Sequence, residues 1–132
     1  MQKAKEIAVF TSTRADYGLL STLMRGIADG AGLNLQVIVS GTHLSPGFGS
    51  TVNLIYEDGF YVDAAVEMVV SSDTGVGVAK SFGLGVLGYV DALARLKPDY
   101  LIVLGDRYEA LAITQAAFLM KIRVVHLHGG EM

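Results

Sequence analysis

An aspartate and an arginine, Asp106 and Arg107, follow an apolar run and Gly105 in the stretch VLGDRYEALA. A carboxylate near a helix start and beside a guanidinium stays ionised, so Asp106 suits the role of a base or an electrostatic partner at neutral pH. The alternative is structural, with Asp106 as the N-cap of the following helix and Arg107 bonded to it or to Glu109. Residue type and spacing alone leave both interpretations open.

Arg14, in the polar stretch STRADYG after the first apolar run, is a candidate for binding an anion. Arginine can hold a phosphate through two hydrogen bonds, and a helix N-terminus expected near Tyr17 and Gly18 would offer free N–H groups to the same anion. The alternative is a surface arginine paired with Asp16. Neither a GxGxxG dinucleotide fingerprint nor a GxxxxGK[ST] phosphate loop is present at this position.

The last stretch, HLHGGE, holds His126, His128 and Glu131. Alternation along a strand places the two histidines on one face, but clear further ligands are lacking, so no metal is expected. We expect His126 to be a core histidine bonded to backbone, and we take His128 and Glu131, nearer the strand end, as candidates for proton transfer. His43, in the polar stretch SGTHLSP, is a candidate for substrate binding.

The elements that must position these residues alternate between strand and helix, which predicts one α/β domain with a doubly wound parallel sheet. The polar stretches then fall at the carboxyl ends of the strands, where such sheets bind ligands. Glycines at 83, 85 and 88 are costly in a helix, so we expect close packing there. Strands are predicted over 5–12, 33–41, 61–70, 99–106 and 122–130, and helices over 19–29, 51–60, 90–97 and 107–121.

The composition narrows the class of protein. The chain has 132 residues, of which 52% are hydrophobic and 17% charged, with no cysteine and a net charge of −3. The apolar excess suits a parallel sheet buried on both faces, or a domain that packs against a further part. The charge argues against nonspecific binding of nucleic acid, and the lack of cysteine excludes disulfides. We expect no apolar run to be long enough to span a membrane, and we recognise no signal peptide. We therefore expect a cytoplasmic protein without a membrane partner.

The three stretches AVFTSTRADYGLL, LGDRYEALA and HLHGGE, in this order, resemble the hydrolysing UDP-N-acetylglucosamine 2-epimerases, which feed the synthesis of sialic and related acids. The likeness runs from about Ile7 to Glu131. It implies a GT-B fold, in which two Rossmann-like domains enclose the active site. Residues 1–132 would then be the N-terminal domain, without the C-terminal nucleotide-binding domain, and inactive alone. The alternatives are a GT-B glycosyltransferase and a non-catalytic α/β binding domain.

The resemblance also implies a reaction. UDP is eliminated across C1–C2 of the sugar to give a glycal, and water is then added with inversion at C2, without a metal or redox cofactor. The products are UDP and a manno-configured sugar such as N-acetylmannosamine. Homodimers are common in the family, so we expect a homo-oligomer, with the apolar segment 81–93 as a candidate contact.

Roles for single residues follow from the same resemblance. Arg14 and Ala15 match the loop that contacts UDP, while Gly18 replaces a serine of some relatives and contributes backbone only. Arg107 matches an arginine near the nucleotide-sugar, and Asp106 matches an acidic catalytic residue.

The last motif departs from the family pattern. Many members read His-x-Glu-Gly-Gly-Glu there, whereas this chain has His128 at the first glutamate position. The second proton-transfer group is therefore either His128 or Glu131. The departure also suits a different substrate, such as the UDP- or GDP-linked diacetylated bacillosamine.

Overall fold

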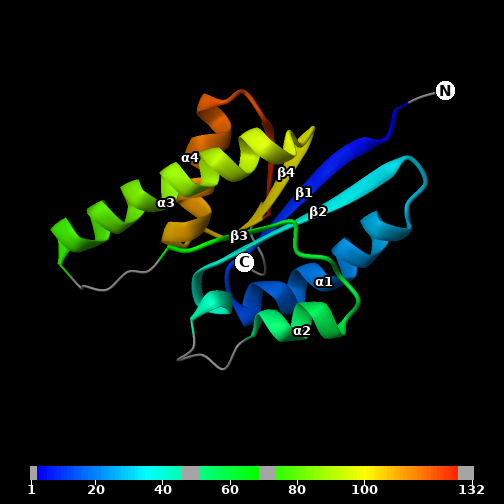
Figure 1. The fold of residues 1–132 in the computed structure, drawn as a ribbon, viewed down its shortest axis with the longest axis horizontal. Coiled ribbons are helices and arrows are strands. Elements are labelled where there is room, and N and C mark those ends of the chain that lie inside the picture. Colours follow the sequence, from blue (N-terminus) through cyan, green and yellow to red (C-terminus); the bar gives the residue numbers. More distant parts are fainter. Residues whose placement is uncertain (1–2, 46–50, 69–73, 128–132) are drawn as a thin grey trace.

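Five parallel strands form one sheet with helices on both faces (Figure 1). The computed structural model describes residues 3–45, 51–68 and 74–127. The strand order β3-β2-β1-β4-β5 reverses direction between β1 and β4, as in a Rossmann-like half, and confirms the predicted doubly wound sheet. The elements are β1 (Lys5–Thr11), α1 (Arg14–Asp29), β2 (Leu33–Ser40), the 3₁₀ turn η1 (Gly41–Leu44), α2 (Val52–Glu57), β3 (Ala64–Val66), α3 (Gly75–Leu96), β4 (Tyr100–Leu104), α4 (Tyr108–Leu119) and β5 (Arg123–Leu127).

The central strand β1 explains the apolar composition, because both of its faces are buried. Ala8 and Phe10 pack into the cluster that α3 and α4 cover, whereas Ile7 and Val9 pack into the cluster that α1 and α2 cover. Successive side chains therefore point alternately to the two helical layers, and residues 7–10 form a continuous apolar run. β1 pairs with β2 on one side and β4 on the other, which joins distant parts of the chain.

Two of the three expected close packings of α3 are confirmed. A Cβ at Gly85 would lie 2.7 Å from Sδ of Met68, and one at Gly88 would lie 2.6 Å from Cγ1 of Val66. These glycines let the helix lie directly against β3 and the residues after it. The expectation is wrong for Gly83, where a Cβ would meet no atom of the described residues within 4 Å.

The edge strand β3 is shorter than predicted, since it covers Ala64–Val66 rather than 61–70. Asp63 stands just before it and contacts Val37 of β2 twice. The Asp63 N–H donates to the Val37 carbonyl at 2.8 Å, and the Asp63 carboxylate accepts from the Val37 N–H at 2.7 Å. A side chain thus replaces one ladder bond, which ends the regular pairing at this point.

The helix α3 corrects the expectation that no apolar run approaches a membrane span. By length and composition alone it is long and apolar enough to cross a membrane. Core helices of soluble proteins pass the same test. Tyr89 and Leu93 of α3 are buried in the core, whereas Leu84 and Leu87 are exposed.

Candidate functional site

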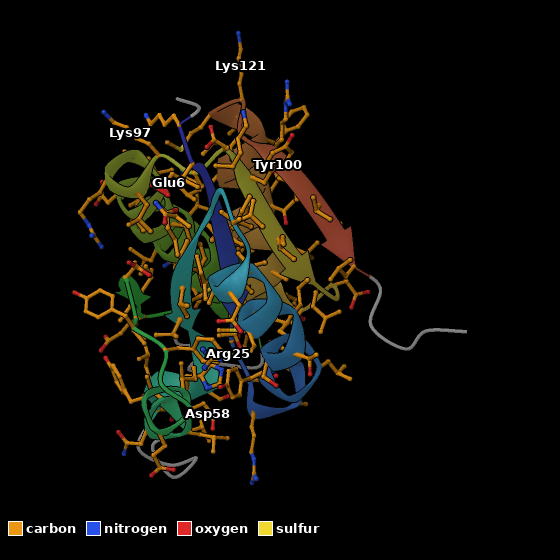
Figure 2. All side chains as sticks on the ribbon, turned by 90° about the vertical axis from the view of Figure 1, so that its right-hand side faces the viewer. Glu6, Arg25, Asp58, Lys97, Tyr100 and Lys121 are labelled. Carbon is orange, nitrogen blue, oxygen red and sulfur yellow. The ribbon has the colours of Figure 1, made fainter. Side chains whose placement is uncertain are left out.

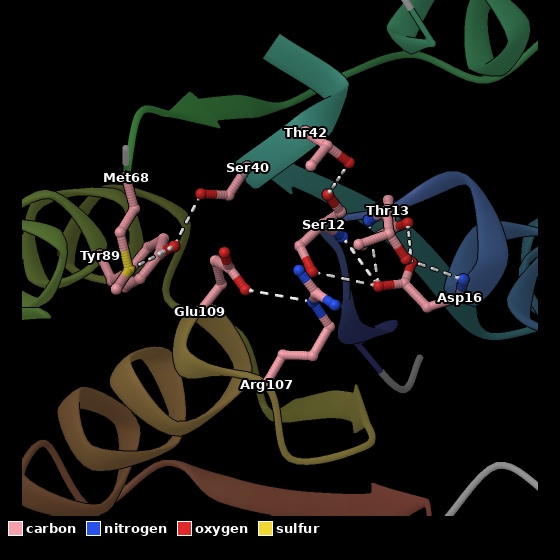
Figure 3. A network of polar contacts seen from close by, with 10 residues as sticks. Ser12, Thr13, Asp16, Ser40, Thr42, Met68, Tyr89, Arg107 and Glu109 are labelled. Atoms are coloured by element: carbon pink, nitrogen blue, oxygen red, sulfur yellow. Dashed lines mark hydrogen bonds and ion pairs between the residues drawn. The ribbon is translucent and has the colours of Figure 1, made fainter. Parts of the chain in front are cut away.

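The loops that follow β1, β2 and β4 meet at the carboxyl edge of the sheet (Figure 3). The Thr42 N–H donates to the Ser12 carbonyl at 2.9 Å, which ties η1 to the loop after β1. A Cβ at Gly41 would lie 2.7 Å from that carbonyl oxygen and 3.5 Å from Cγ of Glu109 in α4. The loop after β1, the turn η1 and the first turn of α4 therefore meet at Gly41, whose φ of +59° suits glycine.

The opposite edge of the sheet has a different character. Figure 2 shows Glu6, Lys97, Tyr100 and Lys121 together at one end of the molecule, far from the labelled Asp58. Charged groups there make local contacts, such as the 2.8 Å bond from the Glu6 N–H to the Asp99 carboxylate. The candidate site residues lie at the other edge, where parallel α/β sheets bind ligands.

Asp16 organises the loop between β1 and α1. Its carboxylate accepts hydrogen bonds from the Thr11 hydroxyl, from the Ser12 N–H and hydroxyl at 3.1 Å each, and from the Thr13 N–H at 3.1 Å. The Thr13 hydroxyl accepts from the Asp16 N–H at 3.1 Å, which completes a capping box. The loop is thereby held in one conformation by a single carboxylate.

This cap corrects two predictions about the first helix. The helix begins at Arg14, not at Leu19, so its N-terminal N–H groups belong to Arg14 and Ala15 rather than to Tyr17 and Gly18. Asp16 is occupied by the cap and does not pair with Arg14. Arg14, Ala15 and Gly18 are all exposed, and Gly18 stands one turn inside the helix.

His43 lies buried beneath this loop. Its ring is 1% exposed, with Nε2 2.8 Å from Oγ1 of Thr11 and Nδ1 2.9 Å from Oγ1 of Thr51. Burial lowers the pKa of His43, with a smaller opposing effect from the charge of Asp16. Both ring nitrogens are therefore occupied by protein hydroxyls in this arrangement.

The structural alternative for Asp106 holds only in part: Arg107 pairs with Glu109, as that alternative allowed, but Asp106 is not the N-cap of the helix. The helix α4 begins at Tyr108 with Arg107 at the N-cap position, and no side chain makes a capping hydrogen bond there. β4 ends at Leu104, earlier than predicted, and Gly105 turns the chain with a φ of +80°. Asp106 is exposed, and no described residue donates a hydrogen bond to its carboxylate.

The last strand places one candidate and leaves two outside the described residues. His126 is bonded to backbone as predicted, with Nε2 2.5 Å from the Gly105 carbonyl oxygen. It is exposed, however, so the expectation of a core histidine is wrong. The bond links the end of β5 to the turn before Asp106. His128 and Glu131 lie outside the described residues.

Glu109 is a residue whose burial the sequence did not indicate. It is 6% exposed, and its Oε2 is fully buried without a hydrogen-bond donor among the described residues. The nearest cation is Arg107, whose Nε lies 3.6 Å from Oε2 in the one ion pair found within the described ranges. Spacing suggested Glu109 only as a partner of Arg107, because the surrounding helix is apolar on all sides and no periodicity marks the inward face.

The arrangement is chemically suited to an anionic ligand with a reacting carbon nearby. Two exposed guanidinium groups, of Arg14 and Arg107, stand at the starts of α1 and α4, where helix N-termini also favour negative charge. Asp106 stands between β4 and α4 with no competing donor among the described residues. Those residues hold no group of three His, Asp or Glu with metal-binding geometry.

The family model and the similar proteins all point to the 2-epimerases. A family model described as UDP-N-acetylglucosamine 2-epimerase matches residues 26–132. The chain is 38% identical to the hydrolysing GDP/UDP-N,N'-diacetylbacillosamine 2-epimerase of Campylobacter jejuni, over 97% of this chain and 33% of that protein. It is 36% identical to the hydrolysing UDP-N,N'-diacetylbacillosamine 2-epimerase of Legionella pneumophila, over 96% of this chain and 34% of that protein. The chain thus spans about a third of the length of these relatives.

The fold is shared with solved structures as well. A UDP-GlcNAc 2-epimerase from Neisseria meningitidis, solved with UDP-GlcNAc bound, superposes with a TM-score of 0.76 at 20% identity. The superposition covers 96% of this chain and 32% of that one. At this identity the likeness establishes the fold.

Proposed function

Since this chain belongs to the UDP-N-acetylglucosamine 2-epimerase family, we propose that it forms the N-terminal, Rossmann-like domain of a hydrolysing nucleotide-sugar 2-epimerase. The enzyme has a GT-B architecture, and its active site lies between this domain and a C-terminal nucleotide-binding domain. The observation that carries the proposal is the placement of Arg14, Asp106 and Arg107 at the carboxyl ends of β1 and β4, which are neighbouring strands.

The proposed reaction has two steps. A base removes the proton from C2 of the sugar while the C1–O bond breaks and the nucleoside diphosphate leaves, which gives a glycal. Water then adds across the double bond, with a proton delivered to the opposite face of C2 and hydroxide to C1. The first step needs a positioned base and stabilisation of the departing diphosphate.

The residues present suit these needs. Asp106 is the proposed catalytic base, because its carboxylate has no donor among the described residues. Arg14 and Arg107, together with the first N–H groups of α1 at Arg14 and Ala15, would bind the diphosphate. Gly18 would contribute only through its backbone.

The second proton-transfer group is proposed to be His128 or Glu131, which follow β5. His43 would act indirectly in this scheme, by holding the loop that carries Arg14.

A nucleotide-linked diacetylated bacillosamine is the preferred substrate, and UDP-N-acetylglucosamine is the alternative. The support is the greater identity to the two diacetylbacillosamine epimerases than to the 30% identical UDP-N-acetylglucosamine 2-epimerase of Neisseria meningitidis.

We also propose self-association through α3 and α4, where Leu84, Leu87 and Phe118 are exposed. Size measured over a dilution series tests this, and a strictly monomeric enzyme at all concentrations would contradict it.

The reaction in deuterated water tests the proposed function. The complete enzyme, incubated with either nucleotide-sugar, should release UDP or GDP and a manno-configured sugar that carries deuterium at C2. A GT-B glycosyltransferase would instead transfer the sugar to an added acceptor without deuterium at C2. A non-catalytic binding domain would release no nucleotide. Either of these results would overturn the proposal.

A further inference from the structure

The buried carboxylate of Glu109 stands out among the side chains at the carboxyl edge. Its Oε2 is one of three buried side-chain oxygens in the described residues that have no hydrogen-bond donor. A buried charge without full hydrogen bonding is costly to the fold, and each such group in a native protein calls for an explanation. An apolar side chain would serve packing in this helix better.

The surroundings of Glu109 indicate where the charge acts. On one side, its Cγ lies 3.5 Å from the position of a Cβ at Gly41, next to the Ser12 carbonyl. On another side lies Tyr89, whose hydroxyl is 2.6 Å from Oγ of Ser40. Burial raises the pKa of Tyr89, and the negative charge of Glu109 acts in the same direction. The carboxylate thus sits behind the loops after β1 and β2.

The third neighbour is Arg107, and it differs from the others in exposure. Its side chain is 62% exposed, whereas that of Glu109 is 8% exposed. Figure 3 shows the guanidinium of Arg107 reaching toward Ser12, with its Nε side turned to Glu109. The 3.6 Å ion pair leaves the two terminal nitrogens of the guanidinium available to a ligand.

We propose that Glu109 is a positioning residue, which holds the Arg107 guanidinium over the loop after β1 so that it meets the diphosphate of the nucleotide-sugar. The inference rests on the proposed function and names the residue that orders its anion site. A long arginine on the surface samples many rotamers, and ordering it on binding weakens affinity. A fixed charge at its Nε restricts that freedom before the ligand arrives. Glu109 itself touches neither substrate nor reacting atoms.

A double-mutant cycle in the complete enzyme tests this role. Glu109→Gln keeps the shape and removes the charge, and Glu57→Gln, an exposed glutamate on α2, is the matched control. We expect Glu109→Gln to raise KM for the nucleotide-sugar and the Kd for UDP about tenfold, while kcat changes less than about twofold. The melting temperature should be unchanged or higher, because a buried charge is lost. Glu57→Gln should alter none of these values.

The second half of the double-mutant cycle compares Arg107→Ala with the double variant that also carries Glu109→Gln. If Glu109 acts through Arg107, Glu109→Gln should have no further effect on the Kd for UDP in the Arg107→Ala background. Equal effects in both backgrounds would overturn the proposal, as would a loss confined to kcat. UDP titration by calorimetry reports binding even without turnover. A wild-type enzyme that binds UDP but does not release it from a nucleotide-sugar would therefore contradict the proposed reaction. The Kd values for UDP of the single and double variants would still test the role of Glu109.

Discussion

The hydroxyl of Thr11 lies 2.8 Å from Nε2 of His43, and the same hydroxyl contacts the carboxylate of Asp16. A hydroxyl has one proton and an ionised carboxylate can only accept, so Thr11 donates to Asp16 and Nε2 of His43 donates to Thr11. Burial favours the neutral ring, whose Nδ1 then accepts from the Thr51 hydroxyl. The hydrogen bond to Thr11 thus places a proton on Nε2 of His43, and burial favours the neutral form of the ring.

The first prediction is that the free energy of unfolding falls as the pH drops below about 6.5, the ordinary pKa of histidine. The pKa of His43 is lower in the folded chain, so the unfolded chain takes up the proton first. Stability is full above the unfolded pKa and is lost toward the folded pKa, at up to about 1.4 kcal/mol per pH unit.

Urea unfolding of wild type and His43→Gln at pH 7.5, 6.5 and 5.5 measures this loss. The fall in the free energy of unfolding between pH 6.5 and 5.5 should be smaller in His43→Gln than in the wild type. His126→Gln, which changes an exposed histidine, should show the same fall as the wild type. The same pH dependence in all three proteins would contradict the assignment.

The second prediction concerns Gly41, which lies against the loop after β1 and the first turn of α4. Gly41→Ala should destabilise the fold by about 2 kcal/mol or more, because a positive φ costs about 1 kcal/mol and the new Cβ also meets the Ser12 carbonyl. Gly32→Ala is the matched control, since its φ is +77° and a Cβ there meets nothing within 4 Å. It should cost only about 1 kcal/mol in denaturant unfolding. Equal costs at the two positions would show that the contact with Ser12 is unimportant.

The third prediction concerns the cap made by Asp16. Asp16→Asn should cost about 1–2 kcal/mol of stability, because an amide cannot accept every bond that the carboxylate accepts. It should also weaken UDP binding in the complete enzyme, since the loop with Arg14 loosens. Asp29→Asn, at the opposite end of α1, removes a negative charge from a helix C-terminus and should be neutral or slightly stabilising. Denaturant unfolding and UDP calorimetry measure both effects.

The fourth prediction separates chemistry from folding at Asp106. Asp106→Asn should lower kcat by at least about 100-fold, as loss of a general base does. The melting temperature should stay the same, because Asp106 is exposed and no described residue donates a hydrogen bond to it. Asp91→Asn, an exposed aspartate on α3, should change neither value. Intact turnover in Asp106→Asn would remove the residue from the proposed mechanism.

Strands β1, β2 and β4 were predictable because burial on both faces leaves short apolar runs, over 7–10, 37–39 and 100–104, which the sequence shows directly. The start of α1 was missed, although Thr13 and Asp16 have the spacing of a capping box; the signal was present in the stretch assigned to a loop.

The burial of polar side chains such as Glu109 and His43 could not be predicted from the sequence. The contact of His43 with Thr11 joins residues 32 positions apart, and the inward turn of Glu109 brings it to Gly41, which lies farther still along the chain. Local patterns carry no information about such partners, so residue types could only suggest the candidate site, while its internal contacts came from the fold.

The place of β1 in the middle of the sheet bears on how the protein is made. Glu6 and Asp99, which join the start of β1 to the start of β4, are 93 residues apart. During synthesis β1 can pair with β2 early, but its other side waits until β4 leaves the ribosome. Non-local parallel pairing of this kind folds slowly and exposes an open apolar strand edge in the meantime. The nascent chain is therefore expected to depend on chaperones during this interval, which a ribosome-release folding assay with and without chaperones would reveal.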